Sequence, residues 1–168
     1  MSKLEIKKYG DSVLRKKNAF VENITDEIKK IAADMLETMY SAPGVGLAAP
    51  QVGISLRMCV IDVSSEKNSP IVMINPKITE WGNKISTEEG CLSFPGIYEN
   101  VKRFEAVGAE YTDLNGKKMK IKAEGFLAKA IQHEIDHLDS KLFIDYLPDW
   151  KRKSVEKEIK RKKKAGDW

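Results

Sequence analysis

Apolar residues recur at helical spacing between residues 25 and 40. They occupy positions i, i+3, i+4, i+7, i+8 and i+11, which lie on one face of a helix. These residues are Ile28, Ile31, Ala32, Met35, Leu36 and Met39. Thr25 or Asn23 can cap the helix, and Pro43-Gly44 follows its end. The stripe predicts an amphipathic helix that packs against the core.

The middle of the chain has the pattern of strands. Four segments are predicted to be strands: residues 57–63, 71–78, 105–112 and 118–122. Asn115-Gly116 separates the last two and is a strong hairpin signal. Met119 and Ile121 alternate with lysines, which is typical of a half-exposed antiparallel strand.

Two further helices are predicted at about residues 126–138 and 148–164. The first has a broad apolar surface, so it is expected to lie in the core. The order helix, strands, helices favours an α+β fold. We therefore expect antiparallel β-sheets packed around the 126–138 helix, together with an N-terminal helix and a C-terminal helix.

Composition narrows the class of protein. The 168 residues are 42% hydrophobic, which suits one globular domain. No run of 18 apolar residues is present, and the N-terminus lacks the apolar segment of a secretory signal, so no membrane association is expected. Two cysteines, Cys59 and Cys91, are too few for a disulfide framework, which favours a cytoplasmic protein.

The positive charge is concentrated at one end. The net charge is +4, but residues 149–168 hold nine bases and four acids and carry +5, whereas the other 148 residues carry −1. A basic block of this kind is typical of a solvated helix or of an arm that binds nucleic acid. A non-enzymatic RNA-binding protein is one hypothesis that this tail supports.

His133 and His137 are the only histidines, and they form an H-E-x-x-H pattern. Four-residue spacing places both imidazoles on one face of a helix, within reach of one metal ion. Glu134 lies roughly 100° further round the helix, where it can act as general base towards a water at the metal. The pattern predicts a hydrolytic metal site.

A catalytic metal site needs a third protein ligand. Glu156 and Glu158 lie downstream at a spacing similar to that of thermolysin-like peptidases, but they fall in the basic tail. Cys91 lies upstream, and its thiolate is a strong ligand for zinc or ferrous iron. Both possibilities stay open on residue chemistry alone. Cys59, in an apolar segment, is expected to be core.

Three segments together resemble the peptide deformylase family. Residues 44–51, 89–93 and 132–140 match motifs of the form G-x-G-x-A-A-x-Q, E-G-C-L-S and Q-H-E-x-D-H-L-x-G, and residues 9–15 resemble the family's opening. The resemblance covers about residues 4–148. One position departs from it, since Ser140 replaces the last glycine; if φ is positive there, serine costs about 1 kcal/mol.

The resemblance implies a metal ion, one per chain, held by Cys91, His133 and His137. It implies Fe²⁺, for which Zn²⁺ or another divalent ion can substitute. The implied reaction removes the N-terminal formyl group from formyl-methionine of nascent polypeptides and releases formate. A water at the metal would attack the formyl carbon, and Glu134 would shuttle the proton.

The resemblance also assigns supporting roles. The Gln51 side chain and the Leu92 backbone N–H would stabilise the oxyanion. Substrate binding falls to Val45, Gly46, Gly90, Phe126 and Ala130. Arg103 would pair with Asp136 or Glu89 to support the metal ligands.

Residues 1–148 are thus expected to form a deformylase catalytic domain, and residues 149–168 a basic helix that is not a separate domain. The resemblance implies that basic residues within 151–164 bind the ribosome near its exit tunnel. On this interpretation, deletion of residues 151–168 weakens ribosome binding and spares turnover of short formyl peptides.

Overall fold

The computed structural model describes residues 1–168. The helices are α1 (Asp26–Ser41), α2 (Gly125–Leu138) and α3 (Asp149–Ala165), with short 3₁₀ turns η1 (Ser12–Arg15), η2 (Ala49–Val52) and η3 (Phe143–Tyr146). The strands are β1 (Gly46–Ala48), β2 (Met58–Ile61), β3 (Ile71–Trp81), β4 (Lys84–Cys91), β5 (Phe94–Phe104), β6 (Ala106–Thr112) and β7 (Lys118–Glu124).

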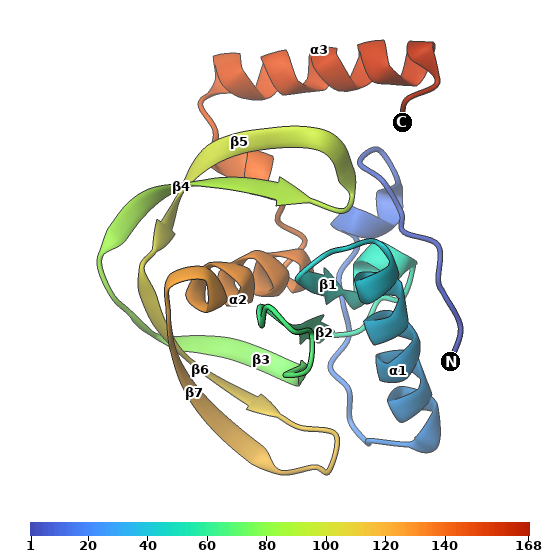
Figure 1. Ribbon diagram of the computed structural model, residues 1–168, viewed down its shortest axis with the longest axis vertical. Helices are drawn as coiled ribbons and strands as arrows, with labels where there is room; N and C mark the ends of the chain where they lie inside the picture. Colours follow the sequence, from blue (N-terminus) through green and yellow to red (C-terminus); the bar gives the residue numbers. More distant parts are fainter.

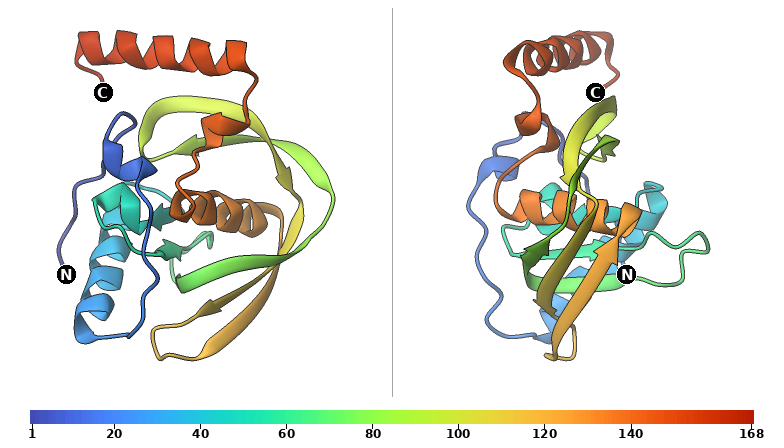
Figure 2. Two further views of the ribbon diagram at one scale, coloured as in Figure 1. Left: turned by 180° about the vertical axis from the view of Figure 1, so that it is seen from behind. Right: turned by 90° about the vertical axis from the view of Figure 1, so that its left-hand side faces the viewer.

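Two antiparallel sheets enclose α2 (Figure 1). One has five strands in the order β1-β2-β3-β6-β7, and β4 and β5 form a separate two-stranded sheet. Helix α1 lies beside β1 and β2, and α3 lies beyond β5 on the outside of the molecule (Figures 1 and 2). The predicted α+β fold with a central H-E-x-x-H helix is confirmed.

Local sequence signals account for several element boundaries. The Thr25 side chain accepts a hydrogen bond from the Ile28 amide and caps α1, whose positive end carries Asp26 and Glu27. Gly116 has a φ of 81° in the turn between β6 and β7, a conformation that glycine adopts without strain. The turn thereby pairs β6 with β7 as the hairpin signal predicted.

The β4–β5 ribbon and β1 were not predicted. Half of the residues of β4 are exposed and only one is buried, and its residues do not alternate between apolar and polar, so the period of a half-buried strand is missing. Strand β3 also continues past residue 78 to Trp81. This ribbon carries Cys91 at the end of β4, so it positions part of the candidate site.

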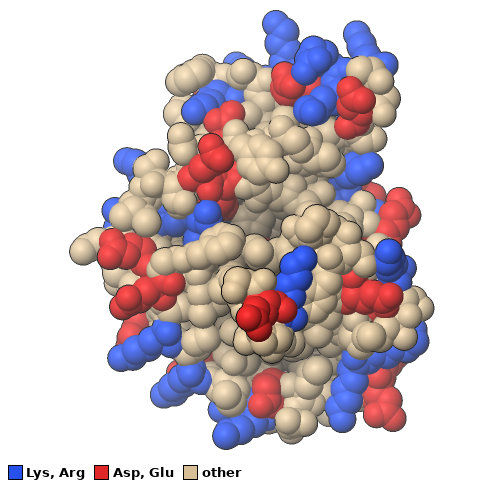
Figure 3. Space-filling model, in the orientation of Figure 1, with Lys and Arg blue, Asp and Glu red and all other residues tan.

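Helix α3 packs on the body through one face. Val155 and Ile159 are buried in a cluster with Leu14 and Phe94, and the Tyr9 hydroxyl donates to Glu156 at 3.0 Å. Lysine and arginine side chains gather on the part of the surface formed by α3, at the top of Figure 3. The solvated-helix interpretation therefore holds for the outer face only. None of the helices combines the length and apolarity needed to cross a bilayer.

Candidate metal centre and active site

Cys91, His133 and His137 come together at the centre of the molecule. Cys91 ends β4, and the two histidines occupy successive turns of α2. Their potential ligand atoms all lie within 4.8 Å of one another, and Cys91 Sγ is 3.4 Å from His137 Nε2. Thiolate and imidazole ligands about 2.0–2.3 Å from one tetrahedral ion would be about 3.5 Å apart. This donor set fits a zinc or ferrous ion.

The glutamates of the basic tail are engaged elsewhere. Glu156 accepts the hydrogen bond from Tyr9, and Glu158 forms an ion pair with Arg161 on the same helix. Neither belongs to the group of metal-ligating side chains, so the alternative third ligand is wrong. Cys59 is completely buried in β2, in the core cluster beside α2.

The pKa values of the two histidines are shifted in opposite directions. Burial lowers the pKa of His137 well below its usual value, so its imidazole is neutral and able to ligate. Burial also acts to lower the pKa of His133, but the negative charges of Glu134 and Cys91 outweigh it and raise that pKa. The negative groups around His133 thus stabilise positive charge beside it, whereas His137 stays neutral.

A chain of charged side chains supports His133. Glu89 Oε1 lies 2.7 Å from His133 Nδ1, which leaves Nε2 to face the metal position. Arg103 donates to both oxygens of Glu89, at 2.6 and 2.8 Å, and to Asp136 Oδ2 at 2.6 Å. Burial acts to raise the pKa of Glu89, but Arg103 and His133 outweigh it and lower that pKa to about 2. Arg103 therefore contacts both of its expected partners.

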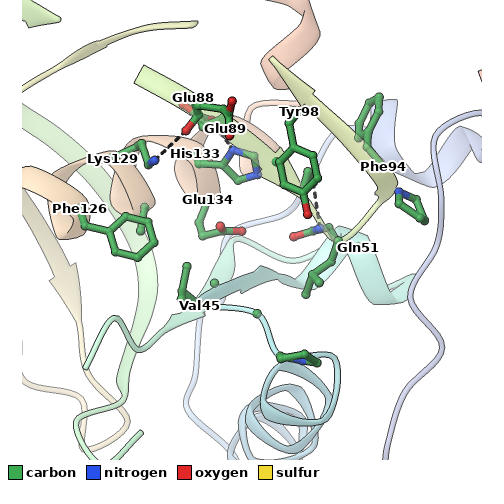
Figure 4. Close-up of a pocket in the computed structure, with 18 of the residues that line it drawn as sticks. Val45, Gln51, Glu88, Glu89, Phe94, Tyr98, Phe126, Lys129, His133 and Glu134 are labelled. Carbon is green, nitrogen blue, oxygen red and sulfur yellow. Dashed lines mark hydrogen bonds and ion pairs between the residues drawn. The ribbon is translucent and has the colours of Figure 1, made fainter. Parts of the chain in front are cut away.

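Glu134 points from α2 into the cavity in front of the histidines (Figure 4). It is only 4% exposed, and burial raises its pKa to about 7. Its Oε1 is buried without a protein partner. A carboxylate with this pKa can both accept and return a proton near neutral pH, which is the property of a general base.

Gln51 is held rigidly opposite Glu134. Its Oε1 accepts from the Ala48 amide at 2.9 Å, and its Nε2 donates to Ser93 Oγ at 3.1 Å and lies 3.5 Å from Cys91 Sγ. The Leu92 amide has no acceptor within the protein. Both groups line or border one pocket, as donors to a developing oxyanion must. Ser93, which fixes the Gln51 amide, was not singled out from the sequence.

The pocket has a volume of about 450 Å³ and is bordered by the unpaired edges of two strands. Strand β1 is at the edge of the five-stranded sheet and β4 pairs only with β5, so each leaves backbone groups unpaired. Gly46 of β1 and Gly90 of β4 line the pocket, as does Val45, which directly precedes β1. An extended peptide could add as a strand between them.

Phe126 and Ala130 line the pocket on the side of α2, as expected. Tyr98 and Lys129 also line it and were missed. Tyr98 lies across from Gly90 in the β4–β5 ribbon, and the Lys129 amine donates to the Glu88 carbonyl at 2.8 Å (Figure 4). Because the ribbon was not predicted, no sequence signal could have placed Tyr98. Lys129 lies in the predicted helix four residues before His133, so helical spacing could have placed it on the face that carries the histidines.

Ser140 adopts a left-handed conformation, with φ of 62°. The Lys141 amide donates to the Asp136 carbonyl and the Ser140 amide to that of His137, which is the Schellman pattern that usually places glycine here. The Ser140 hydroxyl donates to the Lys16 carbonyl at 2.7 Å. The helix that carries the histidines thus ends as it would with glycine, and one hydrogen bond offsets the strain.

Comparison with known proteins agrees with this geometry. Residues 3–153 match the family model of polypeptide deformylase. A peptide deformylase of Endomicrobium trichonymphae is 71% identical over the whole of both chains. The crystal structure of a peptide deformylase from Legionella pneumophila has a TM-score of 0.94 at 42% identity and covers 98% of each chain.

A peptide deformylase from Synechococcus elongatus, solved in complex with actinonin, has a TM-score of 0.88 at 43% identity, covering 95% of this chain and 87% of that one. These similarities extend over β4, which carries Cys91, and over α2, which carries both histidines. The chain belongs to the polypeptide deformylase family.

Proposed function

We propose that this deformylase removes the formyl group from N-formylmethionine of nascent polypeptides at the centre formed by Cys91, His133 and His137. The observation that carries the proposal is that Cys91, His133, the Glu134 carboxylate and the Gln51 amide line one pocket, with the ligand atom of His137 within 4.8 Å of those of Cys91 and His133. We further propose Fe²⁺ as the resident ion, as the family resemblance implies. A thiolate with two imidazoles also suits Zn²⁺.

A divalent ion held by these ligands would act as a Lewis acid and lower the pKa of a water molecule at the site. Glu134 accepts a proton from the attacking water and returns it to the amine that leaves. The buried surroundings that raise its pKa to about 7 match it to both steps. The Gln51 amide and the Leu92 N–H donate to the formyl oxygen as it gains negative charge.

The substrate binds as an added strand between β1 and β4, through the backbone of Val45, Gly46 and Gly90. The methionine side chain enters the part of the pocket walled by Phe126 and Ala130. This arrangement brings the formyl group towards Glu134, because Gly46 lies against the Glu134 carboxylate.

Replacement of Glu134 by alanine tests the central assignment. We expect Glu134→Ala to abolish formate release from a formyl-Met peptide while the protein still binds one metal ion per chain. Cys91→Ser should instead lose metal. Metal analysis of anaerobically purified protein identifies the ion, and Glu110→Ala, on a distant strand, serves as control. Undiminished turnover by Glu134→Ala would refute its role.

We also propose that α3 docks on the ribosome through its outer face, and that the reaction takes place in the cytoplasm, where nascent chains are made. Exposed bases follow the side of α3 opposite Val155 and Ile159. They are Lys153, Lys157, Lys160, Arg161 and Lys164. A row of bases at this spacing suits contact with successive phosphates of RNA.

The docking proposal predicts a salt-dependent interaction. Replacing Lys157, Lys160 and Lys164 with glutamine should weaken binding to purified ribosomes and reduce its dependence on salt concentration. A matched variant with glutamine at Lys118, Lys120 and Lys122 of β7 carries the same loss of charge on another surface and should bind normally. Equal affinity of both variants would refute the assignment to α3.

A further inference from the structure

Arg103 is a buried cation that is paired with two carboxylates inside the protein. Its side chain is 3% exposed and lies between β5 and α2. All of its hydrogen bonds run to two carboxylates, Glu89 and Asp136, and Glu89 in turn contacts Nδ1 of His133. The orientation of His133 therefore depends on where the Arg103 guanidinium is held.

Tyr146 covers the outer side of this cation. It ends η3, and its ring lies over the guanidinium, with Arg103 Cζ 4.9 Å from the ring centroid. Its hydroxyl donates at 2.9 Å to Asp136 Oδ2, the same oxygen that accepts from Arg103. One residue thus contacts both members of the Arg103–Asp136 pair.

Solvent lies immediately outside Tyr146. The tyrosine is 46% exposed, and it lines a surface cavity together with Arg103, Lys84 and Lys102. Without the ring, water from this cavity would reach the guanidinium and compete for its hydrogen bonds. An arginine held by a planar ring and two carboxylates keeps one orientation, whereas a hydrated one samples several.

We propose that Tyr146 is a positioning residue for the metal centre, and that it acts on His133 through Arg103 and Glu89. The inference rests on the proposed role of His133 as a ligand. Tyr146 touches neither the substrate pocket nor a metal-ligating atom, so its effect is on how firmly the ligand is held. Partners that orient a ligating histidine typically change metal affinity 10–100-fold when removed.

Release of Zn²⁺ to a chromophoric chelator tests the proposal in the full-length, Zn²⁺-loaded protein. We expect Tyr146→Ala to release the ion about 10-fold faster than the unmodified protein. Tyr146→Phe keeps the ring and loses the hydroxyl, so its release rate should fall between the two. KM for a formyl-Met peptide should stay within about twofold, since the pocket is untouched.

Trp81→Ala is the matched control, because Trp81 is also about half-exposed and packs edge-on against Phe104. Phe104 follows Arg103 on β5, so the two side chains point to opposite faces of the strand. It should leave Zn²⁺ release unchanged. Unchanged release from Tyr146→Ala, or equal acceleration by Trp81→Ala, would overturn the proposal; if Tyr146→Ala does not fold, unchanged release from Tyr146→Phe does so. The measurement needs no substrate, so absence of deformylase activity would count against the proposed function separately.

Discussion

The carboxylate of Glu134 lies directly against the Cα of Gly46, in space that a side chain at position 46 would fill. A β-carbon built on Gly46 would collide with the carboxylate and would lie within 3.0 Å of Glu134 Cγ. Gly46 does not have a positive φ, so its backbone conformation does not explain the glycine. Glycine is required at this point of β1 because the Glu134 carboxylate approaches it closely.

Gly46→Ala should therefore damage catalysis more than folding. The added methyl group has to displace the Glu134 carboxylate, and a shift of about 1 Å in a catalytic group costs about 100-fold in rate. We expect kcat for a formyl-Met peptide to fall by about that factor, with metal content unchanged. Gly116→Ala is the control: its positive φ strains a turn that does not line the pocket, so it can cost stability but should leave kcat unchanged. An active Gly46→Ala enzyme would contradict the close fit.

Glu89→Gln should destabilise the protein strongly. The substitution leaves the buried guanidinium of Arg103 without its main counter-charge, and breaking a buried ion pair in this way costs about 3–5 kcal/mol. Glu110→Gln removes a partly exposed carboxylate that pairs with Lys77 and Lys120 at the surface and should cost less than about 1 kcal/mol. Urea unfolding of the two variants measures the contrast, and equal losses would contradict it.

Ser140 offers a test of backbone strain against hydrogen bonding. Ser140→Ala loses the hydrogen bond to Lys16 and keeps the positive φ, so it should destabilise by about 1 kcal/mol. Ser140→Gly loses the same bond but relieves strain of about 1 kcal/mol, so the two effects offset. Unfolding free energies should rank glycine above alanine at this position; the reverse order would exclude strain there.

What the sequence could predict was set by local signals. The helix that carries His133 and helix α1 both have a strong apolar period, and α1 also has the Thr25 cap before it and Pro43-Gly44 after it. The β4–β5 ribbon has no such signal, because its stability comes from pairing along its length and from Phe94 and Ile97 beneath α3. Residue chemistry alone consequently left the third metal ligand open between Cys91 and the tail glutamates.

The β4–β5 ribbon also connects the C-terminal helix α3 with the pocket, a contact that the sequence did not indicate. Charge placed residues 149–168 outside the neutral body, but their two inward-facing apolar residues, Val155 and Ile159, are too few to give a sequence signal. In the fold they cover Phe94, which lines the substrate pocket and stacks on Tyr9 at 4.9 Å between ring centroids.

Ile159→Ala should consequently destabilise the catalytic body itself. The side chain is 3% exposed within the cluster that includes Phe94, and truncation of a buried isoleucine costs about 2–5 kcal/mol. Lys160→Ala, the next residue on the exposed face, should change stability by less than about 0.5 kcal/mol. The unfolding free energy of the full-length variants distinguishes them.

Deletion of residues 151–168 should likewise lower stability. Substitutions on the outer face of α3 leave this cluster intact, so they test docking without changing folding. If Ile159→Ala were as harmless as Lys160→Ala, α3 would be an appendage and the simple deletion would suffice.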